Sequence, residues 1–230
     1  YFGNEEHELA AIEFNRLATN YPSSAFFVNA MFMRAVAFFE ATPENPGLDQ
    51  TDLQKAIDLL QDFLMDFPES ELVPDAKTYL SLARTRMAQK FFNAAMVYER
   101  IGAWEAAKIY YQKVVDEYSD TKQASQAAYH RALMEMKQRN YSTAREQFEA
   151  FVATFPDHKL APEARKYAVE AAFRSCRKSF DAGNYAEARQ CLQDFGQAYP
   201  GNGYEDDAAD LLKQIEQQPV EPEPGERAGS

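Results

Sequence analysis

An aromatic residue, in most cases followed by proline, recurs through this chain of 230 residues and defines a common register. Alanine stands eleven positions before each aromatic and returns nine positions after it, and large apolar residues stand seven and four positions before it. A set of columns this regular predicts an internal structural repeat. The five aromatics are Tyr21, Phe67, Tyr118, Phe155 and Tyr199, of which all but Tyr118 precede proline.

Each repeat is predicted to be a helical hairpin. Apolar offsets of three, four and seven mark one face of an α-helix, which the proline then ends. A second helix follows, and its first amides are expected to find N-cap oxygens on Ser23, Ser70, Thr121 and Asp157. The pattern predicts helices over residues 4–20, 24–41, 51–66, 72–101, 103–117, 122–139, 141–154, 160–182, 185–198 and 204–217. No segment alternates as a strand would, so the predicted fold class is all-α.

The chain is long enough, and at 46% apolar residues hydrophobic enough, to bury a core. We expect a single domain over residues 1–217, with N-terminal repeats in 4–101 and C-terminal repeats in 102–217. Residues 218–230 are polar and rich in proline, and this composition predicts a disordered tail.

The net charge of −12 argues against nucleic-acid binding. Such a charge repels a phosphate backbone, and lysine and arginine never form a run longer than two. No stretch approaches the roughly 18 consecutive apolar residues of a membrane span. We therefore expect neither a nucleic-acid partner nor a membrane-spanning segment.

One segment resembles the second helix of a tetratricopeptide repeat (TPR). It runs from Gly102-Ala103-Trp104 to Tyr110-Tyr111-Gln112-Lys113, and Gly183-Asn184-Tyr185-Ala186-Glu187-Ala188 repeats it. The resemblance implies a TPR-like right-handed solenoid of about five helical hairpins with a C-terminal capping helix. The aligned aromatics are 46, 51, 37 and 44 residues apart instead of the usual 34, so the helices or their connections are lengthened.

These lengthened repeats are similar to those of the BamD lipoproteins over roughly residues 8–154. The most specific segments are Met31-Phe32-Met33-Arg34-Ala35 and the junction Glu99-Arg100-Ile101-Gly102-Ala103-Trp104. The resemblance implies a scaffold at the periplasmic face of the outer membrane that helps to insert β-barrel proteins. The partners it implies are unfolded barrel proteins, a POTRA domain of a BamA-type protein and accessory lipoproteins. The acylated cysteine of such a lipoprotein is absent from these residues, so the resemblance implies a lipid anchor that this chain lacks.

The TPR register suggests which residues bind other polypeptides. In a TPR solenoid the first helix of each pair lines the concave surface, which would make a peptide-binding groove of Asn29, Phe32, Val36 and Phe39. Arg34 is expected to pair with a peptide carboxylate, because a guanidinium holds a carboxylate through two hydrogen bonds. The corresponding partner interface would comprise Gln126, Tyr129, Leu133 and Met136. Two alternatives stay open: these side chains pack on a neighbouring helix, or Arg34 pairs with a nearby glutamate.

Catalysis finds little support in the sequence. His7, His130 and His158 have no metal-ligand spacing, and no nucleophile or phosphate-binding motif occurs, so we expect neither an enzyme, a cofactor nor a metal. Cys176 and Cys191 flank the turn at Gly183 symmetrically, and two buried thiols are favoured over a disulfide. The alternative function is another periplasmic TPR adaptor, such as a cell-division or secretion accessory protein. A cytosolic co-chaperone is disfavoured because an acidic peptide needs a cationic groove.

Overall fold

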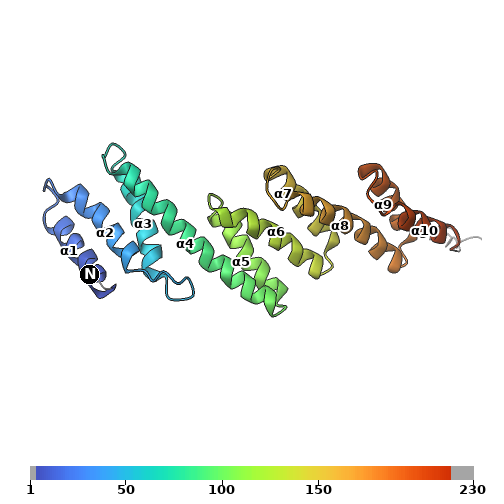
Figure 1. Cartoon of the computed structure of the whole chain (residues 1–230), viewed down its shortest axis with the longest axis horizontal. Coiled ribbons are helices and arrows are strands. Elements are labelled where there is room, and N and C mark those ends of the chain that lie inside the picture. Colours follow the sequence, from blue (N-terminus) through green and yellow to red (C-terminus); the bar gives the residue numbers. More distant parts are fainter. Residues whose placement is uncertain (1–3, 219–230) are drawn as a thin grey trace, which may run out of the picture. The chain divides into compact units, whose positions relative to one another are not determined.

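The computed structural model describes residues 4–218, and this part of the chain is all helical, with no strand (Figure 1). Each predicted helix coincides with an observed one within three residues. The predicted tail, apart from Gln218, lies outside the described residues. The helices are α1 (Asn4–Asn20), α2 (Phe27–Ala41), α3 (Thr51–Asp66), α4 (Val73–Arg100), α5 (Trp104–Glu117), α6 (Lys122–Lys137), α7 (Tyr141–Thr154), α8 (Ala161–Asp181), α9 (Tyr185–Ala198) and α10 (Glu205–Glu216).

The chain divides into two compact units, Tyr1–Met134 and Glu135–Ser230, and the boundary falls near the end of α6. In the first unit each of α1 to α4 packs on the next helix, up to α5. In the second unit α7 packs on α8, α8 on α9, and α10 on both α8 and α9. The boundary that the sequence predicts between N-terminal and C-terminal repeats, at residue 101, lies inside the first unit.

The alanine and aromatic columns form the seams between helices. Ala107 and Tyr111 of α5 are both fully buried, and Ala188 and Leu192 of α9 occupy the same positions in the second unit. An alanine lets two helix backbones approach closely, and the bulky residue one turn later fills the space beside it. These seams confirm the prediction of an all-α, TPR-like solenoid.

The turns before α2, α4 and α8 differ from the prediction. In place of Ser23 and Asp157, the accepting side chain stands three residues after the aromatic. Ser24 Oγ, Ser70 Oγ and His158 Nδ1 each accept the backbone N–H two residues ahead, at 3.2 Å. The N-cap assignment was therefore wrong at these three helices, whose N-cap residues make no side-chain cap hydrogen bond. This extra turn explains why α2 begins at Phe27 and not at residue 24.

The favoured state of the two cysteines was also wrong. Cys176 of α8 and Cys191 of α9 form a disulfide, with 5.3 Å between their Cα atoms. Gly183 has a φ of +81°, which glycine adopts without steric cost, and it reverses the chain between the two helices. The hairpin thereby brings the two cysteines to the same height, and their spacing around the turn allowed this pairing.

Candidate functional site

A hollow of about 650 Å³ lies in the first unit, where the turn between α3 and α4 meets the start of α2. Phe67 forms part of its wall and packs edge-on against Phe27, with 6.0 Å between ring centroids. A second ring contact, 5.2 Å from Phe63, anchors Phe67 to the core side of α3. The hollow is lined by Val28, Asn29, Asp66, Phe67, Pro68, Glu69, Ser70, Glu71 and Leu72.

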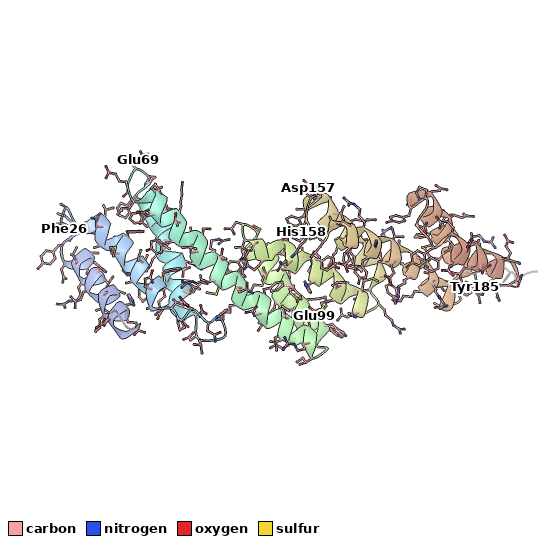
Figure 2. All side chains as sticks on the ribbon, in the orientation of Figure 1. Phe26, Glu69, Glu99, Asp157, His158 and Tyr185 are labelled. Carbon is pink, nitrogen blue, oxygen red and sulfur yellow. A yellow bond between two sulfur atoms is a disulfide. The ribbon has the colours of Figure 1, made fainter. Side chains whose placement is uncertain are left out.

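Exposed apolar side chains come from the same segments as the hollow. Phe26, next to the start of α2, is 66% exposed, and Met65, at the end of α3, is 77% exposed. Figure 2 shows the Phe26 ring projecting away from the ribbon and Glu69 projecting from the turn between α3 and α4. Burying such side chains against a partner contributes roughly 1.5–3 kcal/mol each. The surface therefore combines apolar contact area with three carboxylates, from Asp66, Glu69 and Glu71.

Of the five predicted groove residues, the structure places only Asn29 in the lining of this hollow. Phe32 is 6% exposed and packs against Phe63 and Tyr79, with ring centroids 5.7 and 5.9 Å away. Val36 and Phe39 are also buried. For these three side chains the structure shows the packing role that the sequence had left as an alternative.

Arg34 is half-buried and makes no ion pair or hydrogen bond with any other residue between 6 and 218. The glutamate partner that the sequence left open is therefore not found in the described part of the chain. Along the axis of α2, Arg34 lies five residues beyond Asn29, a rise of about 7.5 Å. A guanidinium in this state can still accept a carboxylate from another molecule.

The predicted interface residues on α6 have unequal exposure. Tyr129 is buried, whereas Gln126, Leu133 and Met136 are half-buried. Leu133 packs against the large apolar core of the first unit. These three half-buried side chains remain partly accessible to a partner.

A polar network beside α6 is one that the sequence did not predict. The Glu99 carboxylate of α4 accepts a hydrogen bond from the Tyr111 hydroxyl at 2.5 Å and lies 3.1 Å from His130 Nδ1. The His130 ring stacks on Tyr111, with 5.4 Å between centroids. Burial, followed by the hydrogen bond to Glu99, raises the pKa of Tyr111. The network joins α4, α5 and α6 through contacts among its own side chains, so we assign it a structural role.

A second polar contact holds the turn after α5 against α4. Arg84 donates to both carboxylate oxygens of Asp120, at 2.6–3.1 Å, and to the backbone carbonyl of Glu117 at 2.6 Å. The hydrogen bond from Arg84 lowers the pKa of Asp120. Both residues lie within residues 8–154, over which the chain resembles the BamD lipoproteins, but their contact joins residues 36 positions apart and no sequence pattern indicated it.

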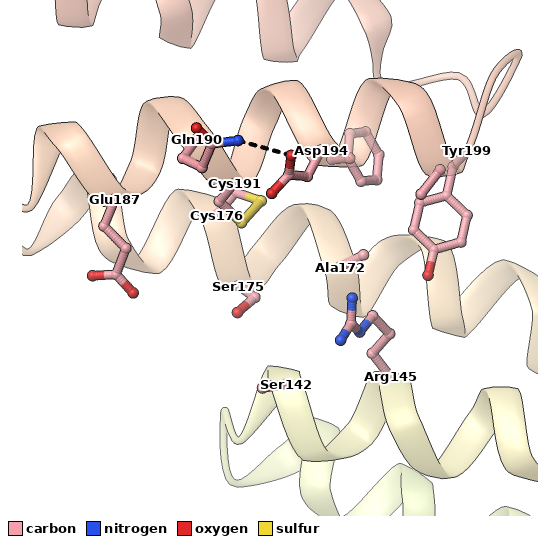
Figure 3. A pocket seen from close by; sticks show the side chains of 12 residues that line it. Ser142, Arg145, Ala172, Ser175, Cys176, Glu187, Gln190, Cys191, Asp194 and Tyr199 are labelled. Atoms are coloured by element: carbon pink, nitrogen blue, oxygen red, sulfur yellow. Dashed lines mark hydrogen bonds between the residues drawn. A yellow bond between two sulfur atoms is a disulfide. The ribbon is translucent and has the colours of Figure 1, made fainter.

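The second unit has a hollow of about 500 Å³ between α7 and α9, with α8 as its floor (Figure 3). The disulfide lies at this floor, and Arg145 of α7 extends toward Ala172 of α8. On α9, Gln190 donates a hydrogen bond to Asp194 at 2.9 Å. Burial raises the pKa of Tyr199, at one end of the hollow, to about 12. The lining mixes both charges with apolar groups and indicates no single ligand.

Within residues 4–218, no group of three or more His, Cys, Asp or Glu side chains could hold a metal ion. In that same range none of the helices has the length and apolar character needed to cross a membrane.

Comparison with known families gives two matches. The model of the YfiO family, described as an outer membrane lipoprotein, matches residues 1–128. A tetratricopeptide repeat model matches residues 126–158 and 176–202. No curated protein matches the chain. The first match covers α1 to α5 and the start of α6, and therefore includes the hollow beside α2.

Proposed function

Because the chain belongs to the YfiO family of outer membrane lipoproteins, the BamD-type family that its sequence resembles, we propose that it is a non-enzymatic scaffold of the outer-membrane β-barrel assembly complex. Outer-membrane association and TPR repeats are properties of the families that match. The periplasmic face, the substrates and the partners belong to the proposal. The observation that supports it best is the family match over a unit that exposes a hollow with apolar side chains beside it.

The first unit would receive the aromatic-ended C-terminal segment of an unfolded barrel protein. An aromatic side chain of that segment would enter the hollow beside Asn29 and contact Phe26 and Met65. Its terminal carboxylate would pair with Arg34, which has no partner among the described residues, and would avoid the carboxylates of the hollow. Phe32, Val36 and Phe39 would support α2 from beneath without touching the peptide.

Toward the C-terminus, the accessible side chains of α6 would contact a POTRA domain of a BamA-type protein. Gln126, Leu133 and Met136 are the candidates, with buried Tyr129 holding the helix in place. Accessory lipoproteins would bind elsewhere on the C-terminal repeats. The alternative is another periplasmic TPR adaptor, which the match of residues 126–158 and 176–202 to a general TPR model also fits.

Peptide binding tests the first part of the proposal. A labelled ten-residue peptide from the C-terminus of a barrel protein, ending in phenylalanine, is titrated with the full chain. Phe26→Ala with Met65→Ala should weaken binding at least tenfold, since two apolar contacts of roughly 1.5 kcal/mol or more are lost. Ile109→Ala, which truncates an exposed apolar residue of α5, is the matched control and should leave the affinity unchanged.

Arg34 is tested by amidating the C-terminus of the same peptide. Amidation should weaken binding to the wild-type chain but not to Arg34→Gln, because the variant has already lost the pairing. An equal loss of affinity on amidation in both proteins would show that Arg34 does not pair with the peptide carboxylate. A pull-down from outer-membrane extract that recovers a different envelope protein, and no BamA-type protein, would favour the alternative adaptor function.

A further inference from the structure

Helix α8 carries an unusual concentration of positive charge for this acidic chain. It holds five exposed basic residues and three acidic ones, whereas the whole chain has 24 basic and 36 acidic residues. The neighbouring helix α10 is acidic in its first turn, with Glu205, Asp206 and Asp207. The basic residues of α8 are Arg165, Lys166, Arg174, Arg177 and Lys178.

Two hollows open along this side of α8, and both are lined by Tyr204 at the start of α10. One, of about 500 Å³, contains Arg174, Arg177 and Lys178. The other, of about 430 Å³, contains Arg165 and Lys166. The Tyr204 ring stacks on Phe173 of α8, with 4.7 Å between centroids, so an aromatic pair separates the two basic ends.

Most of this positive charge is not neutralised within the described residues. Arg174 pairs with Glu170 at 2.7 Å, and the Lys178 ammonium donates to the backbone carbonyl of Arg139 at 3.2 Å. Arg165, Lys166 and Arg177 have no ion pair or hydrogen bond with any residue between 4 and 218. Together the two hollows are lined by six basic and three acidic side chains, the sixth basic one being Arg139.

The length of this surface constrains what can bind it. From Arg165 to Lys178 the helix rises about 20 Å, which an extended polypeptide spans in about six residues. A small anion would reach only one end, whereas a segment with carboxylates six residues apart would reach both. The rest of the chain has a net negative charge and repels an acidic segment, so this face is the favourable binding site for it on the second unit.

We propose that this face of α8, together with Tyr204, binds an extended acidic segment of another protein, with carboxylates about six residues apart. An apolar or proline residue midway along the segment would lie on the Tyr204–Phe173 pair. The binding would be electrostatic, fast and sensitive to salt. It does not depend on the barrel-assembly role or on the hollow beside α2.

The test uses the full chain and a fluorescein-labelled 12-residue peptide, with two Glu-Glu pairs placed six residues apart and a central proline. Fluorescence anisotropy measures its Kd at 50 mM and 300 mM NaCl. Arg177→Glu with Lys178→Glu should raise the Kd at least tenfold. Arg165→Glu with Lys166→Glu, in the other hollow, should also raise the Kd at least tenfold. An isomeric peptide with its four glutamates adjacent should bind at least fivefold more weakly, because it reaches one end only.

The matched control reverses two basic residues outside the hollows, Arg189 of α9 and Lys213 of α10, both exposed. Arg189→Glu with Lys213→Glu changes the net charge equally and should alter the Kd less than twofold. An equal loss in the control would show that net charge alone attracts the peptide and would overturn the proposal. Circular dichroism of each variant shows whether it keeps its helical content. The neutral variant Arg177→Gln with Lys178→Gln removes the two charges without reversing them, so a loss of binding in a folded neutral variant is not a loss of folding.

Two further outcomes would assign the face to another occupant and overturn the proposal. In the first, the chain shortened after Gln218 binds the peptide tenfold more tightly, which would make Glu221, Glu223 and Glu226 of this chain the occupant. In the second, the protein sediments with vesicles of 30% phosphatidylglycerol in phosphatidylcholine and has no affinity for the peptide. The variant Arg177→Glu with Lys178→Glu no longer sediments with these vesicles. The face would then bind an anionic membrane.

Discussion

Breaking the Cys176–Cys191 disulfide should loosen the hairpin of α8 and α9. The bond closes a loop with a sequence separation of 15, for which the chain-entropy relation gives about 3 kcal/mol of stabilisation. Because the two helices also pack through Phe173, Leu192 and Phe195, the hairpin should persist after reduction, but with a smaller free energy of opening. We expect a fall of about 2–3 kcal/mol, equivalent to roughly 30- to 150-fold faster amide exchange in α9.

Hydrogen exchange followed by mass spectrometry measures this change helix by helix. Reduction of the wild-type chain breaks the bond without removing an atom, and Cys176→Ala with Cys191→Ser provides the same state without a reductant. The alanine is needed because Cys176 is 1% exposed and a serine hydroxyl there would have to be desolvated. Peptides of α3 and α4, in the other unit, serve as the internal control. Exchange in α9 that stays within threefold of the oxidised protein would refute the reasoning.

Three other perturbations test contacts that hold the helices together. Asp120→Asn should lower the free energy of unfolding by about 0.5–1 kcal/mol at pH 7, because Asp120 is half exposed and its contact with Arg84 is screened. Since its pKa is lowered in the folded chain, this stabilisation is present above the unfolded pKa of about 4 and disappears as the pH falls through the folded pKa. The difference between wild type and variant in urea titrations should therefore be full at pH 7 and smaller at about pH 3. Tyr111→Phe should cost about 1.5–3 kcal/mol in chemical denaturation, the range for a hydrogen bond to a charged group, and a loss below 0.5 kcal/mol would show that the α4 carboxylate finds water instead. Gly183→Ala should lower the free energy of unfolding by about 1–2 kcal/mol, and with it the melting temperature, because φ is +81° there. Gly196→Ala, inside α9 with open space around it, should raise the melting temperature, and a rise in both variants would contradict the turn geometry.

The predicted peptide groove shows where sequence patterns stop being informative. The spacing of Phe32, Val36 and Phe39 indicated correctly that they share one face of α2. The pattern did not indicate whether that face would stay open. In the structure α3 and α4 cover it, and the Arg86 guanidinium lies 4.2 Å from the Phe39 ring centroid. An apolar stripe indicates that one face of a helix is buried, but it does not indicate which helix or partner covers that face.

The hollow beside α2 had only a weak signal in the sequence. Its residues surround the Phe67-Pro68 pair, which we interpreted as a helix end, and the carboxylates of Glu69 and Glu71 look like an ordinary solvated turn. The hollow exists because the turn after α3 comes to lie beside the first turn of α2, some forty residues earlier in the chain. A contact at that separation follows from packing and not from local pattern.

What this sequence determined by itself is therefore its local structure and its repeat: the ten helices of residues 4–218, their bounds within three residues, and the alanine and aromatic seams. Helix periodicity, proline and small residues act within a few positions of the chain, so they can be read without a structure. Only the tertiary structure decided that the cysteines pair, that Arg84 reaches Asp120, and that the cations of α8 gather around Tyr204. Each of these depends on the distance between side chains of different helices or turns, which is set by how the helices pack and not by the spacing within any one of them.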